Sequence, residues 1–350
     1  MRRQQALLAL LCGVTVVPLL ADAQDVARRP GPASGRGRVL MIGDMTGPAI
    51  DALNRDSTLV LLTVGMLEWH GPHLPIAADL IGVAYEAERV AGRLSRALPG
   101  WNVLVMPDIN YGSAGANEIG GIHVHPGTYG MRQSTLRALI ADIGAQIVQN
   151  GFKRVYVMSG HSSPTHGIAV NDACDFISEA FGATMLNVSE LFSADSAIQA
   201  QGRRVQARHY SAADIASFGV DVHAGVKETS GLLAVRPDLV RPIYRTLPGV
   251  RAETSTERRE IAARPGWRGY FSSPARANAS YGRAFEQWWI EGMTDLILRS
   301  VRGENLLGRP RRADGVRNDP VLLQIMEEIL KPEREFEQRL ERWLARRQRE

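Results

Sequence analysis

The sequence predicts a three-layer α/β/α fold with a mainly parallel sheet. Short apolar runs rich in β-branched residues alternate with longer stretches of helical spacing along much of the chain. Strands that are separated by helices favour a parallel sheet covered by helices on both faces. The composition, with 45% hydrophobic and 22% charged residues, is that of a soluble globular protein, and 350 residues can form one large core or two smaller ones.

The predicted strands are short apolar runs. Residues 57–66 are mostly apolar, which suits a strand that is buried on both faces. Shorter runs of the same kind follow at residues 102–107, 154–159 and 183–188. Helical spacing is found between and after them, at residues 80–98, 131–150, 167–181 and 284–301.

Three stretches depart from this alternation. Residues 193–218 are polar and weakly patterned, which predicts an excursion or a partner-contacting segment, and residues 232–275 are rich in proline and arginine and are expected to be irregular. Residues 320–347 predict one or two charged amphipathic helices, with Pro332 expected to break them. We interpret this tail as a packed terminal helix, with a partner-binding helix as the alternative. Its apolar side carries Leu322, Ile325, Met326, Ile329, Phe336, Leu340 and Trp343.

The N-terminus has the features of a signal peptide. Arg2 and Arg3 precede an apolar run at residues 6–20, and a small-x-small cleavage pattern ends at Ala23. The run is short for a membrane span, so we expect export to the periplasm or medium and no stable membrane insertion after cleavage. An uncleaved anchor is the alternative. Cleavage would leave Cys174 as the single cysteine, which excludes an internal disulfide.

The charge pattern does not indicate nucleic-acid binding. The formal net charge is +4 and most of the basic charge is arginine, but no recognition motif accompanies it. We therefore interpret the basic residues as a solvated surface.

The densest group of chemically capable residues follows the first predicted strand. Glu68 and His70 stand two apart at its exit, and Asp79 opens the next predicted helix, where a carboxylate is favoured by the exposed N–H groups. Two carboxylates and an imidazole are a plausible ligand set for a divalent metal. The alternative is a loop cap with histidines bonded to backbone.

Three further clusters follow. Asn117, His123 and His125 lie in a glycine-rich stretch after the second strand and could line a pocket. His161 directly follows the third strand and is a candidate metal ligand, whereas a serine nucleophile at Ser159 or Ser162 lacks the surrounding elbow pattern. For each histidine a structural role remains open.

The fourth cluster contains His223 and Glu228, which offer a proton shuttle and a further metal ligand. Three of the four clusters follow predicted strands, and ligand sites of open α/β sheets lie at the carboxyl ends of strands. Together they predict one site.

These motifs together resemble the creatininase (creatinine amidohydrolase) family. Glu68-x-His70-Gly-Pro-His73-Leu-Pro with Asp79 is similar to its signature, and His125-Pro-Gly-Thr128, Gly-His161, His223-Ala-Gly-x-x-Glu228-Thr-Ser230 and Asn278-Ala-Ser-Tyr-Gly282 resemble further motifs over roughly residues 40–300. The resemblance implies a three-layer α/β fold, one or two divalent metal ions (Zn, Mn or Fe), hydrolysis of a non-peptide C–N bond, and a homo-oligomer, often a hexamer.

The resemblance also implies roles for individual residues. Glu68, Asp79 and His161 match the ligands of one metal, His70 and a bridging Asp79 match those of the other, and His223 matches the catalytic histidine. Two departures stand out: Ser162, Ser163 and Pro164 follow His161 where the family has Gly-Gly-Asn or a metal-binding glutamate, and Val226 replaces a glutamate. The second metal is therefore expected to use Glu228 or to bind weakly.

The sequence thus predicts an exported metal-dependent amidohydrolase that acts on a small-molecule amide. Residues 1–23 are the expected signal peptide, residues 24–38 a flexible lead-in, residues 39–303 the hydrolase domain and residues 304–350 a charged helical extension. The alternative is an exported metal- or ligand-binding protein of the same fold without turnover, which the changes at Ser163 and Val226 favour.

Overall fold

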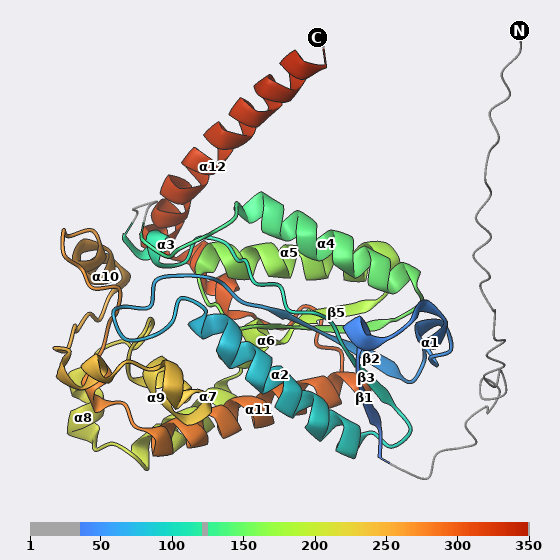
Figure 1. Cartoon of the computed structure of the whole chain (residues 1–350), viewed down its shortest axis with the longest axis horizontal. Helices are drawn as coiled ribbons and strands as arrows, with labels where there is room; N and C mark the ends of the chain where they lie inside the picture. Colours follow the sequence, from blue (N-terminus) through green and yellow to red (C-terminus); the bar gives the residue numbers. More distant parts are fainter. Residues whose placement is uncertain (1–35, 121–124, 349–350) are drawn as a thin grey trace, which may run out of the picture. The chain divides into compact units, whose positions relative to one another are not determined.

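A five-stranded sheet forms the centre of the fold, and all of its strands run parallel (Figure 1). The computed structural model describes residues 36–120 and 125–348, and these belong to one compact unit. The strand order is β1-β3-β2-β4-β5, which confirms the predicted parallel sheet. The strands are β1 (Arg38–Met41), β2 (Thr58–Val64), β3 (Asn102–Val105), β4 (Arg154–Ser159) and β5 (Thr184–Asn187).

Helices cover both faces of the sheet, as predicted. α2 (Ala78–Ala97) and α11 (Ala279–Val301) pack on one face, and α4 (Gln133–Gln149) and α5 (Pro164–Phe181) pack on the other (Figure 1). Every residue of β2 is buried. Its side chains alternate between the two layers, because Leu59 and Leu61 join the core of α2 and α11 whereas Val60 joins the core of α4 and α5.

Shorter helices complete the chain. They are α1 (Gly47–Asp51), α3 (Ala116–Gly120), α6 (Val188–Ala194), α7 (Ser196–Ala207), α8 (Ala212–Phe218), α9 (Val226–Val235) and α10 (Ser255–Ala262), with the long α12 (Pro320–Arg347) at the end. The four predicted strands and the four predicted helices within residues 80–301 are confirmed as β2–β5, α2, α4, α5 and α11, each within a few residues of its expected bounds.

At two places the structure contains regular elements that the sequence did not predict. The predicted lead-in ends at residue 38, but Arg38 already begins the edge strand β1, whose four residues are too short for a periodic signal. The weak pattern at residues 193–218 hides the helices α7 and α8, which Asp195 and Ser211 cap at their N-termini. Their polar character reflects exposure, since Ile198 and Phe218 are their only buried residues.

The proline- and arginine-rich stretch is irregular only in part. Residues 232–275 contain the end of α9, the short 3-10 segments Pro237–Leu239 and Pro242–Thr246, and the helix α10. Thr254 and Glu257 form a capping box that starts α10.

The prediction that Pro332 breaks the terminal helix is wrong, because α12 continues through it. A proline inside a helix removes one backbone hydrogen bond and bends the helix without necessarily ending it. The helix is fixed on both sides of Pro332. Ile325 and Ile329 are buried before it, and Glu333 after it accepts a hydrogen bond of 2.8 Å from the backbone N–H of Gln133 at the start of α4.

The predicted signal peptide and almost all of the predicted lead-in lie outside the described residues. Within the described part of the chain, none of the helices combines the length and the apolar character that a membrane crossing requires.

Candidate metal centre

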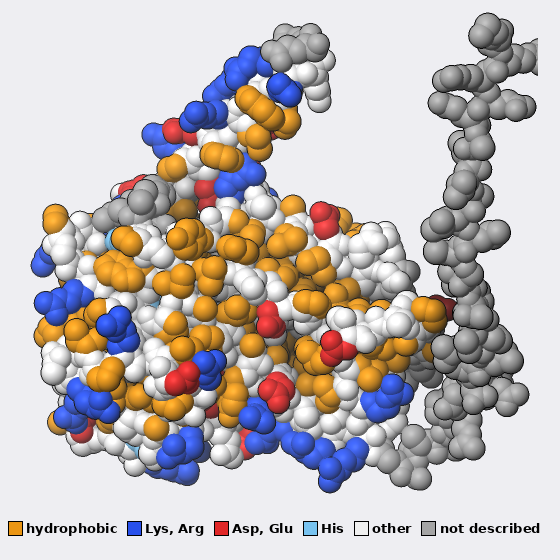
Figure 2. Space-filling view, in the orientation of Figure 1, with side chains coloured by type: hydrophobic (Ala, Val, Ile, Leu, Met, Phe, Trp, Pro, Cys, Tyr) orange, Lys and Arg blue, Asp and Glu red, His pale blue; other side chains and the backbone are white. Residues whose placement is uncertain are grey.

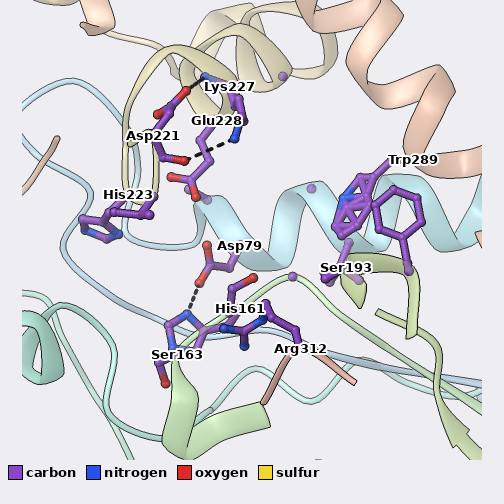
Figure 3. A pocket seen from close by; sticks show the side chains of 18 of the residues that line it. Asp79, His161, Ser163, Ser193, Asp221, His223, Lys227, Glu228, Trp289 and Arg312 are labelled. Atoms are coloured by element: carbon purple, nitrogen blue, oxygen red, sulfur yellow. Dashed lines mark hydrogen bonds and ion pairs between the residues drawn. The ribbon is translucent and has the colours of Figure 1, made fainter. Parts of the chain in front are cut away.

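Five ionisable side chains from four separate segments meet beside the carboxyl end of the sheet. Glu68 and His70 lie in the loop after β2, Asp79 in the first turn of α2, and His161 two residues after β4. Glu228 lies in the first turn of α9, and in Figure 3 its carboxyl group points toward Asp79. β2 and β4 are neighbours in the sheet, which brings their following loops together.

Asp79 lies between two groups of potential ligands. In the first group, Nδ1 of His161 lies 3.0 Å from a carboxylate oxygen of Glu68 and 3.0 Å from one of Asp79. In the second, Nε2 of His70 lies 3.1 Å from the other oxygen of Asp79 and 3.6 Å from Glu228. The ligand atoms within each group lie within 4.8 Å of one another, so each could hold a metal ion.

The first four of these residues are almost completely buried, and their charges depend on one another. Burial disfavours the charged form of His70, but the carboxylates of Asp79 and Glu68 outweigh it and raise the pKa of His70 to about 10. The pKa of His161 is also raised, because Glu68 and Asp79 outweigh its burial. Burial likewise opposes ionisation of Asp79, but the two histidines hold the pKa of Asp79 well below its usual range.

The residues fit a divalent cation. Nε2 of His70, which lies 3.1 Å from Asp79 and 3.6 Å from Glu228, is buried and has no hydrogen-bond partner, a situation that proteins avoid unless another species satisfies the atom. Carboxylate oxygens and imidazole nitrogens are ligands that zinc, manganese and iron accept.

His223 lies beside these groups in a fixed orientation. Its Nε2 donates a hydrogen bond of 2.8 Å to the backbone carbonyl of Trp69, and its Nδ1 lies 4.0 Å from Glu68. Its ring centre is 4.6 Å from that of His70. Burial lowers the pKa of His223, so the imidazole is neutral near pH 7 and its Nδ1 can accept a proton.

Glu228 is the most accessible member, with a side chain that is 38% exposed. One of its oxygens accepts a hydrogen bond of 2.5 Å from the backbone N–H of Ala224, which adopts a positive φ of 48°. Burial raises the pKa of Glu228 to about 7, although the neighbouring His70 opposes this rise.

The approach of α2 to the end of β4 depends on Gly160. A Cβ atom at this position would lie 2.1 Å from the backbone carbonyl oxygen of Asp79. Because only glycine allows this contact, the sequence Gly160-His161 lets the helix carry Asp79 against the imidazole. β2 ends at Val64, four residues before Glu68, so the alternation of side chains along a strand does not orient Glu68 and His70. Hydrogen bonds within the loop orient them instead, and Nδ1 of His70 lies 3.1 Å from the backbone carbonyl oxygen of Glu68.

A family model described as creatinine amidohydrolase, from the creatininase family, matches residues 43–297. The chain belongs to the creatininase family. This confirms the resemblance that the motifs indicate, and it sets the chemistry of the site within a family of amide-bond hydrolases.

Two relatives are similar to this chain over most of their own length. The chain is 28% identical over 280 residues to a mycofactocin precursor peptide peptidase from Mycobacterium ulcerans, covering 76% of this chain and 93% of that protein. It is 27% identical over 208 residues to a creatinine amidohydrolase from Pseudomonas putida, covering 57% of this chain and 74% of that protein.

Solved structures share the fold. A creatinine amidohydrolase (creatininase) structure has a TM-score of 0.55 at 24% identity and covers 76% of this chain and 99% of that chain. A creatinine amidohydrolase from Bacteroides fragilis, identified as putative in its description, has a TM-score of 0.55 at 19% identity and covers 76% and 98%. At these identities the likeness establishes the creatininase fold and nothing finer.

The two departures from the creatininase motifs have structural roles here. Ser163 caps α5, because its side chain accepts a hydrogen bond from the backbone N–H of His166, and Pro164 occupies the first turn. Val226 is fully buried and packs with Tyr210, Phe218 and Tyr281.

Several histidines near the site are structural. Nε2 of His73 lies 2.9 Å from the hydroxyl of Thr229, and burial lowers the pKa of His73 to about 4. His166 is fully buried with Nε2 3.1 Å from the hydroxyl of Ser159, which therefore is not an exposed nucleophile. The ring of His125 contacts Trp69 and Trp267, whereas His123 lies outside the described residues and nothing is described of the side chain of Asn117.

The site opens into a cavity of about 680 Å³. Three buried carboxyls in its lining, those of Glu118, Glu86 and Glu286, had no sequence signal. Glu118 from α3 bonds to Thr165 through a contact of 3.2 Å and lies near His161, and Glu86 from α2 lies beyond the metal-ligand groups. The predicted extension also contributes, since Arg312 and Ile325 line the same cavity.

Proposed function

We propose that the chain is a metal-dependent hydrolase that cleaves an amide C–N bond of a small molecule. The observation that carries this proposal is the pair of ligand groups that share Asp79 at the floor of a cavity. Membership of the creatininase family supports the reaction class. Neighbouring solved structures are named "Creatininase Mn" and mutant creatininase of "Zn-Zn type", so zinc and manganese are the first ions to test here.

The metal ligands would be divided between two sites. Glu68, Asp79 and His161 would hold one ion, and His70, Asp79 and Glu228 would hold the second. Divalent ions in such positions lower the pKa of water toward neutrality and polarise the amide carbonyl. The protein contributes buried carboxylates, whose negative charge the ions would balance. The buried position of these side chains also limits the access of bulk water to the site.

Proton transfer falls to His223 and Glu228. The bond from Nε2 of His223 to the Trp69 carbonyl leaves Nδ1 free of its proton and directed toward the Glu68 side of the site. This nitrogen can take up the proton that water loses when it attacks the carbonyl. Either His223 or Glu228 then returns a proton to the departing nitrogen.

A peptide substrate is the second candidate. The match to a mycofactocin precursor peptide peptidase extends over 93% of that relative, which favours peptide-like amides as an alternative to cyclic or other non-peptide amides. A cavity of about 680 Å³ can hold either a small molecule or the end of a short peptide.

The test is chelator-sensitive hydrolysis. Purified protein is incubated with lactams, formamides and short peptides, and release of amine or carboxylate is followed before and after chelation and metal replacement. We expect hydrolysis of at least one class, loss of activity on chelation and recovery with Zn²⁺ or Mn²⁺. Tight metal binding without turnover of any of these classes would instead support the binding protein.

A further inference from the structure

The cavity has a second polar region beyond the metal-ligand groups. Asp79, Val83 and Glu86 share one face of α2, because residues three and four apart in a helix are neighbours. Seven residues separate the two carboxyls, which places them about 10 Å apart along the helix axis. Glu286 on α11 lines the same part of the cavity, and its carboxyl is close enough to that of Glu86 for each to affect the pKa of the other.

Glu86 and Glu286 form a buried acid pair. They are 6% and 7% exposed, and burial raises the pKa of both carboxyls. Two adjacent buried carboxyls ionise one at a time, so the pair gains its first negative charge near pH 7, the pKa of Glu286, and its second only at higher pH. Oε2 of Glu286 is buried and has no hydrogen-bond partner, so it retains an unused acceptor.

The fold leaves space for this pair at Gly231. A Cβ atom on Gly231 would lie 2.5 Å from Oε1 of Glu286. Gly231 is three residues after Glu228 on α9, so the same helix face borders both the metal-ligand groups and the acid pair.

Aromatic rings form the wall beside the acid pair. Trp289 follows Glu286 by three residues on α11 and contacts Phe192, with ring centres 4.0 Å apart and the rings tilted by 45°. Figure 3 shows Trp289 on the opposite side of the cavity from His223, with Asp79 between them in this view. Aromatic faces attract cations, most strongly those of tryptophan.

The pair is not neutralised by a nearby cation of the protein. In the described part of the chain, no arginine or lysine makes an ion pair with Glu86 or Glu286. Among the cationic residues that line the cavity, Lys227 bonds to Asp221 and Arg312 bonds to Glu190. Arg258 bonds to the hydroxyl of Ser255, and Arg203 is exposed on α7.

We propose that Glu86, Glu286 and Trp289 form a subsite for a cationic group of the substrate, an ammonium or guanidinium. This inference rests on the proposed hydrolase function and narrows it, because the substrate would carry its charge about 10 Å from the amide that is cleaved. The charged group supplies the hydrogen-bond donors that Glu286 lacks, and the tryptophan face adds a cation–π contact.

Binding of n-butylguanidinium and its neutral analogue n-butylurea to the protein as purified, measured by calorimetry, tests the subsite directly. We expect the cation to bind at least about tenfold more tightly than the urea, because only the cation complements the charge of the pair. Glu286→Gln should remove this preference. Glu291→Gln, on the solvent-facing side of the same helix, should retain it.

Asp79→Asn separates this inference from the proposed function. Because the acid pair lies beyond the metal-ligand groups, we expect this variant to bind n-butylguanidinium as the wild type does. Equal affinity for the two probes overturns the subsite. Binding that is lost in Asp79→Asn but retained in Glu286→Gln overturns it as well. If the Gln variant does not fold, Trp289→Leu is used, and an unchanged preference in that variant overturns it equally.

Hydrolysis supplies the second measurement. Among amides that differ only in a terminal amine or methyl group, the wild type should favour the amine in kcat/KM, and Glu286→Gln should lose this preference mainly through KM. Cation binding without hydrolysis of any amide leaves the subsite standing and rejects the hydrolase. Hydrolysis without preference for the amine supports the hydrolase and rejects the subsite.

Discussion

His223 differs from the other site histidines because a bond to the protein backbone, rather than a carboxylate, fixes its ring. His70 and His161 each lie about as close to a carboxylate as a hydrogen bond allows, whereas Nδ1 of His223 is 4.0 Å from Glu68. The carbonyl of Trp69 holds the opposite nitrogen. At the residue scale this geometry supports the proposed role of His223 as a proton carrier, although its ring also lies in a third group of potential ligand atoms with Glu68 and His70.

We therefore expect His223→Gln to lower kcat by about 10²–10⁴-fold, the usual contribution of a general acid–base. Metal content should remain near that of the wild type, because both Asp79 groups are intact. Metal analysis and steady-state kinetics on the same preparation check this. A loss of metal as large as that caused by a change at Asp79 would show that His223 is a ligand.

The acid pair makes a prediction about stability and pH. Burial raises the pKa of Glu286 from 4.5 to about 7, although its bond with Glu86 opposes the rise. Because the folded pKa exceeds the unfolded pKa, ionisation favours the unfolded chain. The free energy of unfolding should fall as pH rises from about 4.5 to 7, by about 3 kcal/mol in total.

Glu286→Gln stays neutral and should avoid this loss. We expect the variant to be more stable than the wild type at pH 8 and similar to it at pH 5, measured by urea unfolding. The same difference at both pH values would mean that the carboxyl of Glu286 does not change its ionisation between them.

The residues that sequence could predict are those held in short motifs. Glu68, His70 and Asp79 lie within twelve positions of the sequence. His161 directly follows a glycine, and His223 begins a His-Ala-Gly segment. Glu86 and Glu286 are separated by 200 positions and belong to no motif, so only the packing of α2 against α11 brings them together. The hydrogen bond from His223 to the carbonyl of Trp69 could not be predicted either, since any residue type carries a backbone carbonyl.

At the scale of elements, β2–β5 and the helices α2, α4, α5 and α11 were predictable because each buries at least one side in the core. The apolar residues that face the core recur with the period of a strand or a helix, and this period is what the sequence shows. α7 and α8 bury one residue each, so caps rather than apolar period define them. Pro332 misled the prediction because anchoring of α12 on both sides outweighs one lost hydrogen bond.

The contact between β4 and α2 gives a prediction at this scale. Gly160→Ala should push α2 away from His161, because the new Cβ would meet the carbonyl of Asp79. We expect a loss of about 1–3 kcal/mol in stability together with weaker metal binding. Gly92→Ala on the same helix meets only the end of Arg96 at 3.6 Å and should be neutral or slightly stabilising. Thermal unfolding and metal titration of both variants distinguish them.

The terminal helix α12 has two unequal halves. Ile325 and Ile329 are buried near Ala114, whereas every residue from 338 to 348 is exposed. Apolar and arginine side chains both lie on the surface of α12 in Figure 2, and Phe336 and Trp343 are 57% and 49% exposed.

Deleting residues 338–350 should therefore change the melting temperature by no more than about 2 °C, since surface changes away from packed features have small effects. Deleting residues 320–350 should lower it strongly, because two buried isoleucines and the Glu333 cap of α4 are lost. Differential scanning calorimetry of the two truncations checks this. A large loss from the shorter deletion would mean that the exposed half is packed against something in solution.

At the scale of the whole molecule, the cavity is lined both by the predicted hydrolase domain and by the C-terminal extension, which the sequence suggests are separate. The family match ends at residue 297, yet Arg312 and Ile325 line the same cavity as Asp79. The extension beyond the matched region therefore belongs to the environment of the site. Its contribution could not be predicted, because a charged amphipathic pattern gives no indication of what its apolar side contacts.

The central claim is that Asp79 holds metal jointly with its two groups of neighbours. The most direct measurement is the metal content of purified protein, by mass spectrometry, for the wild type, Asp79→Ala and the control Glu88→Gln on the exposed face of α2. We predict one to two equivalents of Zn, Mn or Fe in the wild type and the control, and almost none in Asp79→Ala. Full retention of metal in Asp79→Ala would contradict the account.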